Sequence, residues 1–329
     1  MKIKGKIEYG RKYGDCRYKG ASADKEHDMF KKTLKKIACS ALAITSVVAC
    51  AGTFTACETA HPEVRIELQF NKKTYTLDYQ LYRNIAPSTT NHFMWLVENG
   101  YYNNLCVHNY DATNQRMYTG GYSATTAADD DDGLIYKSYY TEVAKYVANA
   151  KTAFPATVWL NDNKTNPTYT VYGEFEDNGF KVENGDIDQT FGSLTMYYNK
   201  KDTTESIYTP YLKSDKQDEV ALRKYSTNSA TSLFYISLYE EALDNSAYCT
   251  FATLDEDSVE MLQEFKSDLE EFIKANHSEN EDGETNSFTS AKSVAVDQDD
   301  RFVGEKDTKI TFNIPKTSII IKSITVTKY

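Results

Sequence analysis

The sequence contains little cysteine, and what it has forms no metal-binding or nucleophilic pattern. Its 329 residues include six cysteines, with no Cys-x-x-Cys pair and no Cys/His spacing typical of a zinc site. No cysteine is combined with histidine as in a thiol nucleophile, and the Ser and Asp residues form no recognisable catalytic triad. We therefore expect neither a metal site nor a cofactor.

Basic residues are in the minority outside the N-terminal region. Residues 1–56 contain 12 Lys and Arg against 5 Asp and Glu, which leaves 25 basic and 43 acidic residues, a net charge of −18, in the rest of the chain. An acidic surface repels phosphate backbones, whereas nucleic-acid binding needs a basic one. We therefore expect no nucleic-acid partner.

The composition also lacks the apolar excess of a multi-spanning membrane protein. The residues are 40% hydrophobic and 26% charged, with a mean hydropathy of −0.59, which is typical of a soluble globular body. The length fits one domain with insertions as well as two domains.

Residues 29–57 have the pattern of a secretory signal. Lysines precede an uncharged stretch over residues 37–56, and small residues precede Cys57. Phe54 to Cys57 resembles the lipobox of bacterial lipoproteins, in which the cysteine is acylated, and Cys50 is a second candidate for the lipid anchor. The alternative is an uncleaved transmembrane anchor. We expect an extracytoplasmic protein, lipid-anchored to the bacterial cell membrane.

Two further features depend on this signal. Residues 1–28 precede the usual start of such a segment, so they are either the product of a start codon assigned too far upstream or a short cytoplasmic extension. With Cys57 acylated, Cys106 and Cys249 remain in the mature chain. They either form a disulfide in an oxidising compartment or stay as two buried free thiols.

Hydrophobic periodicity predicts the first and last parts of a β-rich domain. Residues 64–70 alternate between apolar and polar side chains, as in a strand with one buried face, and a turn follows at residues 71–73. Pro87 then opens a helix that ends at Asn99 and Gly100. A second helix begins near Asp257 or Ser258, and its apolar residues recur at helical spacing. These residues are Val259, Leu262, Phe265, Leu269, Phe272 and Ile273.

The motifs between these helices resemble those of one family. Residues 86–108 are similar to the cyclophilin segment in which an Ala-Pro-x-Thr helix leads to Gly-Tyr-Tyr and a strand with histidine. Further segments match the family's motifs in order: Gly120–Gly121, Tyr172–Phe175, Gly192–Met196, Asn228–Ile236, Leu243–Asp244 and Ile319–Thr327. The resemblance extends collinearly from about Val64 to the C-terminus.

The resemblance implies a mainly β fold, an eight-stranded antiparallel barrel capped by two helices. It places this domain at residues 63–329, with insertions near 124–166, 199–227 and 274–307. The first insertion contains an acidic run, Asp129 to Asp132, which lacks the spacing of an EF-hand loop. It also contains an amphipathic helical pattern whose apolar side is Tyr136, Tyr139, Tyr140, Val143 and Val147. The third insertion begins as a solvated loop.

The resemblance also implies a chemistry, the rotation of X-Pro bonds, whose barrier is about 18–20 kcal/mol. A protein lowers it by seating the proline ring in an apolar pocket and donating a hydrogen bond to the prolyl nitrogen. In cyclophilins an arginine directly after the strand histidine is this donor. Here that position is Asn109, and two extra residues separate His108 from Gly120. Arg116, displaced by this insertion, is the candidate replacement; the alternative is that it faces solvent.

The other pocket positions carry over only in part. Met117 and Leu243 match the family, whereas the remaining positions hold replacements. These are Thr119 at the first Gln, Tyr197 and Tyr198 at Ala-Asn, Leu233 at the second Gln, Tyr235 at the pocket Phe, and Tyr248 near the family's His. We expect these side chains to line one groove that binds peptide; for the four tyrosines the alternative is ordinary packing of β-favouring aromatic residues in the barrel.

Two functions are consistent with this pattern. The first is a divergent cyclophilin-type peptidyl-prolyl isomerase or foldase with weak activity, acting as a monomer on proline-containing segments of exported proteins. The second is a non-catalytic peptide- or ligand-binding surface lipoprotein on the same scaffold, since the polar donors of the family are replaced. Only an activity measurement separates the two.

Overall fold

The computed structural model describes residues 60–125, 133–149, 154–155, 157, 167, 169–178, 187–198, 211–212, 229–243, 247–277, 287–295, 302–303 and 309–329. The predicted signal segment, both candidate lipid-anchor cysteines, residues 1–28 and the acidic run Asp129–Asp132 lie outside these residues. Within the described part, no helix is long and apolar enough to cross a membrane.

The predicted first strand and turn are confirmed as a β-hairpin. Strand β1 (Glu63–Phe70) pairs antiparallel with β2 (Lys73–Leu81), and alternate residues of both are buried. Asn71 and Lys72 join the strands with positive φ angles of 44° and 68°. Two consecutive residues of this conformation are typical of the tight turn whose twist suits a hairpin.

The main sheet is antiparallel and contains ten strands among the described residues. Its order is β3-β16-β1-β2-β12-β9-β11-β5-β4, and β8 pairs with β11 off this path. The bounds of the further strands are β3 Leu105–Cys106, β4 Asn109–Asp111, β5 Arg116–Thr119, β8 Val171–Tyr172, β9 Leu194–Tyr198, β11 Ser229–Ser237, β12 Cys249–Leu254 and β16 Ile320–Lys328.

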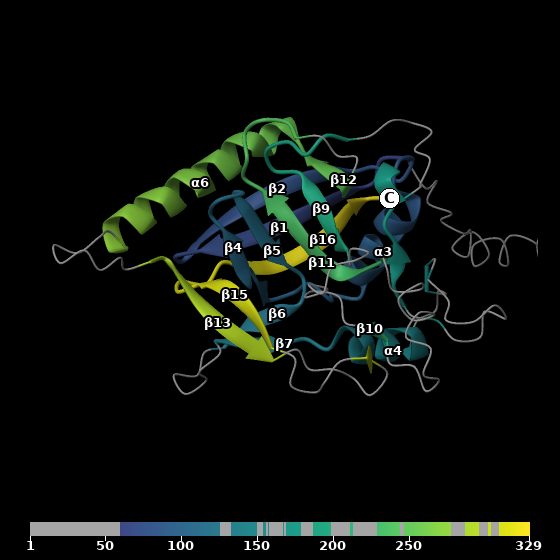
Figure 1. Cartoon of the computed structure of the whole chain (residues 1–329). Helices are drawn as coiled ribbons and strands as arrows, with labels where there is room; N and C mark the ends of the chain where they lie inside the picture. The colour runs from purple at the N-terminus through teal and green to yellow at the C-terminus, as the bar shows by residue number, and fades with distance from the viewer. Residues whose placement is uncertain are drawn as a thin grey trace, which may run out of the picture. The chain divides into compact units, whose positions relative to one another are not determined.

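The sheet curls because its two end strands belong to one segment (Figure 1). Only Val107 and His108 separate β3 from β4. The Val107 N–H donates to the carbonyl of Ile319 at 2.9 Å, and the His108 N–H donates to the carbonyl of Tyr118 at 3.0 Å. The segment is thus bonded to β16 on one side and to β5 on the other, as expected for a barrel-like sheet.

Helix α3 (Pro87–Glu98) starts without a side-chain cap of its own. Its first turn is held by Glu174, whose two carboxylate oxygens accept the N–H groups of Ser88 at 3.0 Å and Thr89 at 2.8 Å. A negative charge at a helix N-terminus is favoured by the helix dipole. This contact explains why a buried glutamate follows Gly173 in a segment far along the chain.

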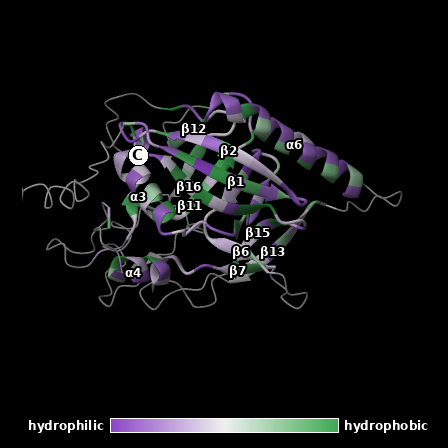
Figure 2. Ribbon diagram, turned by 180° about the vertical axis from the view of Figure 1, so that it is seen from behind, coloured by the Kyte–Doolittle hydropathy of each residue, from purple (hydrophilic) through white to green (hydrophobic). Residues whose placement is uncertain are grey.

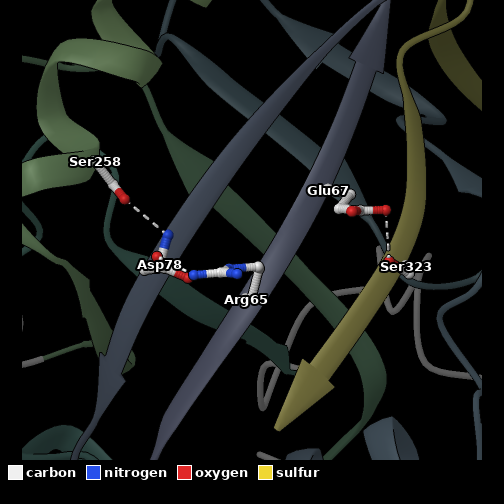
Figure 3. Close-up of polar contacts among 5 residues, drawn as sticks. All are labelled: Arg65, Glu67, Asp78, Ser258 and Ser323. Carbon is white, nitrogen blue, oxygen red and sulfur yellow. Dashed lines mark hydrogen bonds and ion pairs between the residues drawn. The ribbon is translucent and has the colours of Figure 1, made fainter. Parts of the chain in front are cut away.

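Helix α6 (Glu256–Asn276) covers strand β2 with one apolar side. Phe265 packs edge-on against Phe70 and Tyr75, with ring centroids 6.0 and 5.2 Å apart. The Ser258 hydroxyl accepts the N–H of Asp78, which also receives a two-pronged ion pair from Arg65 (Figure 3). Hydrophobic and hydrophilic residues alternate along this helix, which confirms the predicted amphipathic pattern (Figure 2).

The predicted insertions contain secondary structure of their own. The first holds strand β7 (Leu134–Tyr136) and the expected helix α4 (Tyr139–Asn149), although Tyr136 lies on β7 and not on the helix. Strand β6 (Tyr122–Ala124), which pairs with β7, begins before the predicted boundary at residue 124. The pairs β10 (Tyr211–Leu212) with β14 (Phe302–Val303), and β13 (Thr289–Ala295) with β15 (Lys309–Pro315), come from the later insertions. A 3-10 turn, η1 (Glu176–Asn178), follows β8. The β13–β15 hairpin extends beyond the predicted boundary at residue 307.

The core lies between the sheet and the helices. Phe93 of α3 contacts Phe234 and Phe251, with ring centroids 5.5 and 5.0 Å apart, and all three are fully buried. Cys106 and Cys249 are both buried and both free. Of the two alternatives left open by the sequence, the structure therefore has the two buried free thiols and not the disulfide.

Candidate functional site

Strands β5 and β11 position the candidate site. They lie side by side in the sheet, with Tyr118 opposite Tyr235 and Arg116 opposite Ser237 (Figure 1). Because side chains alternate along a strand, Arg116 and Tyr118 share one face, and so does Tyr235 on β11. We call this the outer face of the two strands.

Met117 and Thr119 point to the opposite, inner face. Met117 is fully buried in the main core. The hydroxyl of Thr119 is also buried and donates to the carbonyl of Cys106 at 2.9 Å. Both residues were expected to line the groove, but they lie away from Tyr235. A difference of one residue in register turns a side chain to the other face, and the two extra residues before Gly120 leave the register open in sequence.

Arg116 points toward the aromatic residues of the outer face. Its guanidinium carbon lies 4.8 Å from the ring centroid of Tyr235 and 5.3 Å from that of Tyr248. Its Nη2 donates to the Gln189 Oε1 across 3.4 Å. A cation over an aromatic face is attracted by the ring's quadrupole. The half-buried guanidinium thus packs against the outer face and does not simply face solvent.

Gln189 joins three of the predicted residues, although no sequence pattern pointed to it. It is 1% exposed, and its Oε1 accepts the hydroxyl of Tyr235 at 2.6 Å as well as the contact from Arg116. Its backbone forms a bridge with Leu243, with both N–H groups donating across it at 3.1 and 3.0 Å. Its Nε2 is buried and has no hydrogen-bond partner among the described residues.

Tyr118 is a second residue that the sequence comparison missed. Its ring lies 5.2 Å from that of Tyr235 and 5.8 Å from that of Tyr197, measured between centroids. Burial raises the pKa of both Tyr118 and Tyr235, so these hydroxyls stay neutral. We refer to Arg116, Tyr118, Gln189, Tyr197, Tyr235 and Tyr248 as the Arg116 cluster.

Two other predicted residues, Leu233 and Tyr198, are not members of the cluster. Leu233 is two residues before Tyr235 on the same face and is 6% exposed. It packs against Gly121, where an added Cβ would lie 2.6 Å from the Leu233 Cδ2. Tyr198 ends β9, with its backbone paired to Ala230, and its side chain lies outside the described part of the chain.

Asn109, at the family's arginine position, has a structural contact. Asn109 lies on β4, opposite Tyr118 of β5. Its Oδ1 accepts the backbone N–H of Asn313 on β15 at 2.9 Å. The preceding His108 is buried against Tyr122 and Phe312, with ring centroids 4.8 and 5.0 Å away, and burial lowers its pKa to about 3. This part of the family's site is therefore covered by the β13–β15 hairpin.

The match to a family model covers most of this architecture. Residues 65–282 match the model described as "Cyclophilin type peptidyl-prolyl cis-trans isomerase/CLD". This span includes α3, α6 and every member of the Arg116 cluster. The chain therefore belongs to the cyclophilin-type peptidyl-prolyl cis-trans isomerase family.

Two solved structures are among those similar to this chain. Both are of a Cryptosporidium parvum cyclophilin type peptidyl-prolyl cis-trans isomerase. The first is 14% identical, covers 82% of this chain and 99% of its own, and has a TM-score of 0.38. The second, in the presence of the dipeptide Ala-Pro, is 15% identical with coverages of 81% and 99% and a TM-score of 0.37. No curated protein matches this chain.

Proposed function

We propose that the protein is a weak peptidyl-prolyl isomerase that acts outside the cytoplasm on proline-containing segments of exported proteins. The observation that carries the proposal is the position of Arg116. Its guanidinium lies over Tyr235 and Tyr248, so an arginine is retained beside an aromatic surface although the family's arginine position holds Asn109. A cationic donor next to apolar rings is the combination that X-Pro rotation requires.

The same contacts explain why the activity is expected to be weak. Arg116 contacts Gln189 through one long bond of 3.4 Å and is also hydrogen-bonded to the Tyr118 side chain, so only part of its five N–H groups can serve a substrate. Its stacking on the rings of Tyr235 and Tyr248 also restricts the guanidinium, so it donates less well to the prolyl nitrogen of a substrate. A hydrogen bond from a charged donor contributes about 1.5–3 kcal/mol, so its complete loss reduces a rate by about 10-fold to 100-fold and its weakening by less.

A protease-coupled isomerisation assay tests the proposal. The purified full chain in mild detergent is added to a chromogenic peptide containing one X-Pro bond, and the rate is compared with the thermal rate. We expect a small acceleration that increases linearly with protein concentration. A rate equal to the thermal one at the highest concentration would rule out the isomerase.

The second candidate function is ligand binding without turnover on the same surface. It is favoured by Asn109, whose Oδ1 holds the backbone of Asn313. Calorimetric titration with a proline-containing peptide separates the two functions. Binding without any acceleration of isomerisation supports the second candidate, and acceleration supports the first.

We further propose that Cys57 carries the lipid anchor. The support is the pattern of residues 29–57, in which lysines, an uncharged stretch and small residues precede this cysteine. Bacteria expressing the full chain are grown with a labelled fatty acid. We expect label in the wild-type chain and in Cys50→Ser, and none in Cys57→Ser. The reverse pattern would assign the lipid to Cys50.

A further inference from the structure

We propose that Arg116 and Gln189 together recognise a carboxylate on an acidic side chain adjacent to the proline of the bound peptide. This inference rests on the proposed function, because it names the peptide class that the same site selects. It is carried by a half-buried positive charge and a buried amide donor that lie side by side.

No ion pair of Arg116 is formed within the described residues. Asp111 lies opposite it on β4, but the Asp111 carboxylate accepts hydrogen bonds from Thr113 and Asn114. The Arg116 guanidinium lies over the rings of Tyr235 and Tyr248 and contacts the amide oxygen of Gln189. The ion pairs formed within the described residues involve other basic groups. Because burial keeps the Tyr235 hydroxyl neutral, that tyrosine supplies no counter-charge. A partly desolvated guanidinium in such surroundings gains from an anionic ligand.

Gln189 supplies a second donor at the same place. Its Oε1 accepts from both Tyr235 and Arg116, which fixes the orientation of the amide. The Nε2 of the same amide is buried and has no partner among the described residues. A buried N–H without a partner costs about 1–3 kcal/mol of desolvation, so a ligand acceptor that reaches it is favoured. One carboxylate has two acceptor oxygens and serves both donors.

The aromatic members of the Arg116 cluster explain why the recognised peptide contains proline. The rings of Tyr118, Tyr197 and Tyr235 lie next to one another, with neighbouring centroids 5.2 and 5.8 Å apart. Tyr118 and Tyr197 are partly exposed and offer apolar surface, and the buried Tyr235 supports the ring of Tyr118. A proline ring on this surface places the adjacent residue near the guanidinium of Arg116. The site thus combines an apolar contact for proline with a charged contact for its neighbour.

The test is a panel of C-terminally amidated peptides that differ only at the residue next to proline. Glu, Gln and Lys are compared at that position with the full chain in mild detergent, by isomerisation rate and by calorimetric affinity. We expect Glu to be preferred over Gln by about 10-fold in affinity, because a charge-assisted hydrogen bond replaces a neutral one. Lys is expected to bind worst, and added salt to reduce the Glu preference.

Three variants assign the preference to this site. Arg116→Gln should bind the Glu and Gln peptides equally, and Arg116→Lys should retain part of the preference because it keeps the charge. Gln189→Glu places a carboxylate against Arg116 inside the protein, so it should remove the preference for the Glu peptide while the fold is retained. The matched control is Arg65→Gln, which removes an exposed arginine paired with Asp78 and should leave the preference intact.

The outcomes separate this inference from the isomerase proposal. Preferential binding of the Glu peptide without any accelerated isomerisation supports carboxylate recognition and rejects the isomerase. Accelerated isomerisation with equal use of Glu and Gln peptides overturns carboxylate recognition and retains the isomerase. A preference that appears only for peptides with a free C-terminus assigns the site to the terminal carboxylate, which overturns the side-chain assignment. A preference that survives in both Arg116→Gln and Gln189→Glu also overturns it.

Discussion

The two faces of strands β5 and β11 differ in how far they keep the family's character. The inner face carries Met117 and Phe234, both fully buried in the main core. The outer face carries Arg116, Tyr118 and Tyr235, and Tyr235 replaces the family's pocket Phe. Packing against α3 restricts the inner face to apolar side chains of fixed volume, whereas the outer face is restricted only by the ligand. Fold and chemistry can therefore diverge on the same pair of strands.

The largest expected effect is on the inner face. Phe234→Ala should lower the free energy of unfolding by about 3–5 kcal/mol, because it leaves a cavity next to Phe93 and Tyr102. Urea unfolding followed by circular dichroism measures it. Tyr172→Ala, which removes an aromatic side chain that is 48% exposed, is the matched control and should change stability little. Equal effects of the two variants would contradict the description of the core.

A smaller loss is expected where β8 supports α3. Glu174→Ala removes the carboxylate that accepts the N–H groups of Ser88 and Thr89, so it should cost about 2–3 kcal/mol of unfolding free energy. Glu176→Ala, two residues along and exposed, serves as the control. Thermal unfolding of both variants would sharpen the comparison, since a stable Glu174→Ala variant would show that α3 does not need this cap.

The next effect depends on pH and tests the covered part of the family's site. Burial lowers the pKa of His108 from 6.5 to about 3, so below pH 6.5 the unfolded chain takes up this proton first. The folded state therefore loses stability as pH falls from about 6.5 to about 3, by about 1.4 kcal/mol per pH unit for this group. His108→Phe keeps a ring against Tyr122 and Phe312 and removes the proton uptake.

Urea unfolding at several pH values measures this contribution. Carboxylates and His92, whose pKa burial also lowers to about 3, contribute to the slope in both proteins, so only the difference between wild type and His108→Phe is informative. We expect the variant to have the flatter profile between pH 6 and pH 4. Parallel profiles would show that His108 is solvated or charged in the folded state.

Sequence periodicity was sufficient for the parts of the fold that bury one regular face. The alternation of residues 64–70 and the helical spacing of Leu262, Phe265 and Leu269 predicted β1 and α6. It was insufficient for contacts between distant segments. Nothing near Glu174 indicates that its carboxylate caps a helix 85 residues earlier, because a cap supplied by another segment leaves no local pattern.

The site was predictable only where the register was certain. Tyr235 and Tyr248 both lie against Arg116; the motif around Tyr235 defined its position in sequence, whereas the register of Tyr248 was uncertain. Tyr118 was missed and Met117 was expected in its stead, since the two extra residues before Gly120 make neighbouring positions indistinguishable in sequence. Gln189 was missed because a single buried glutamine has no sequence signature; its role depends on which side chains surround it.

The central claim is that the functional arginine has moved from the position after His108 to Arg116. The most direct measurement compares Arg116→Ala with Asn109→Ala in the isomerisation assay, each normalised to its folded fraction. We predict that Arg116→Ala loses most of the acceleration, about 10-fold or more, and that Asn109→Ala retains it and loses only stability. Loss of the acceleration in Asn109→Ala, with Arg116→Ala unchanged, would contradict the claim.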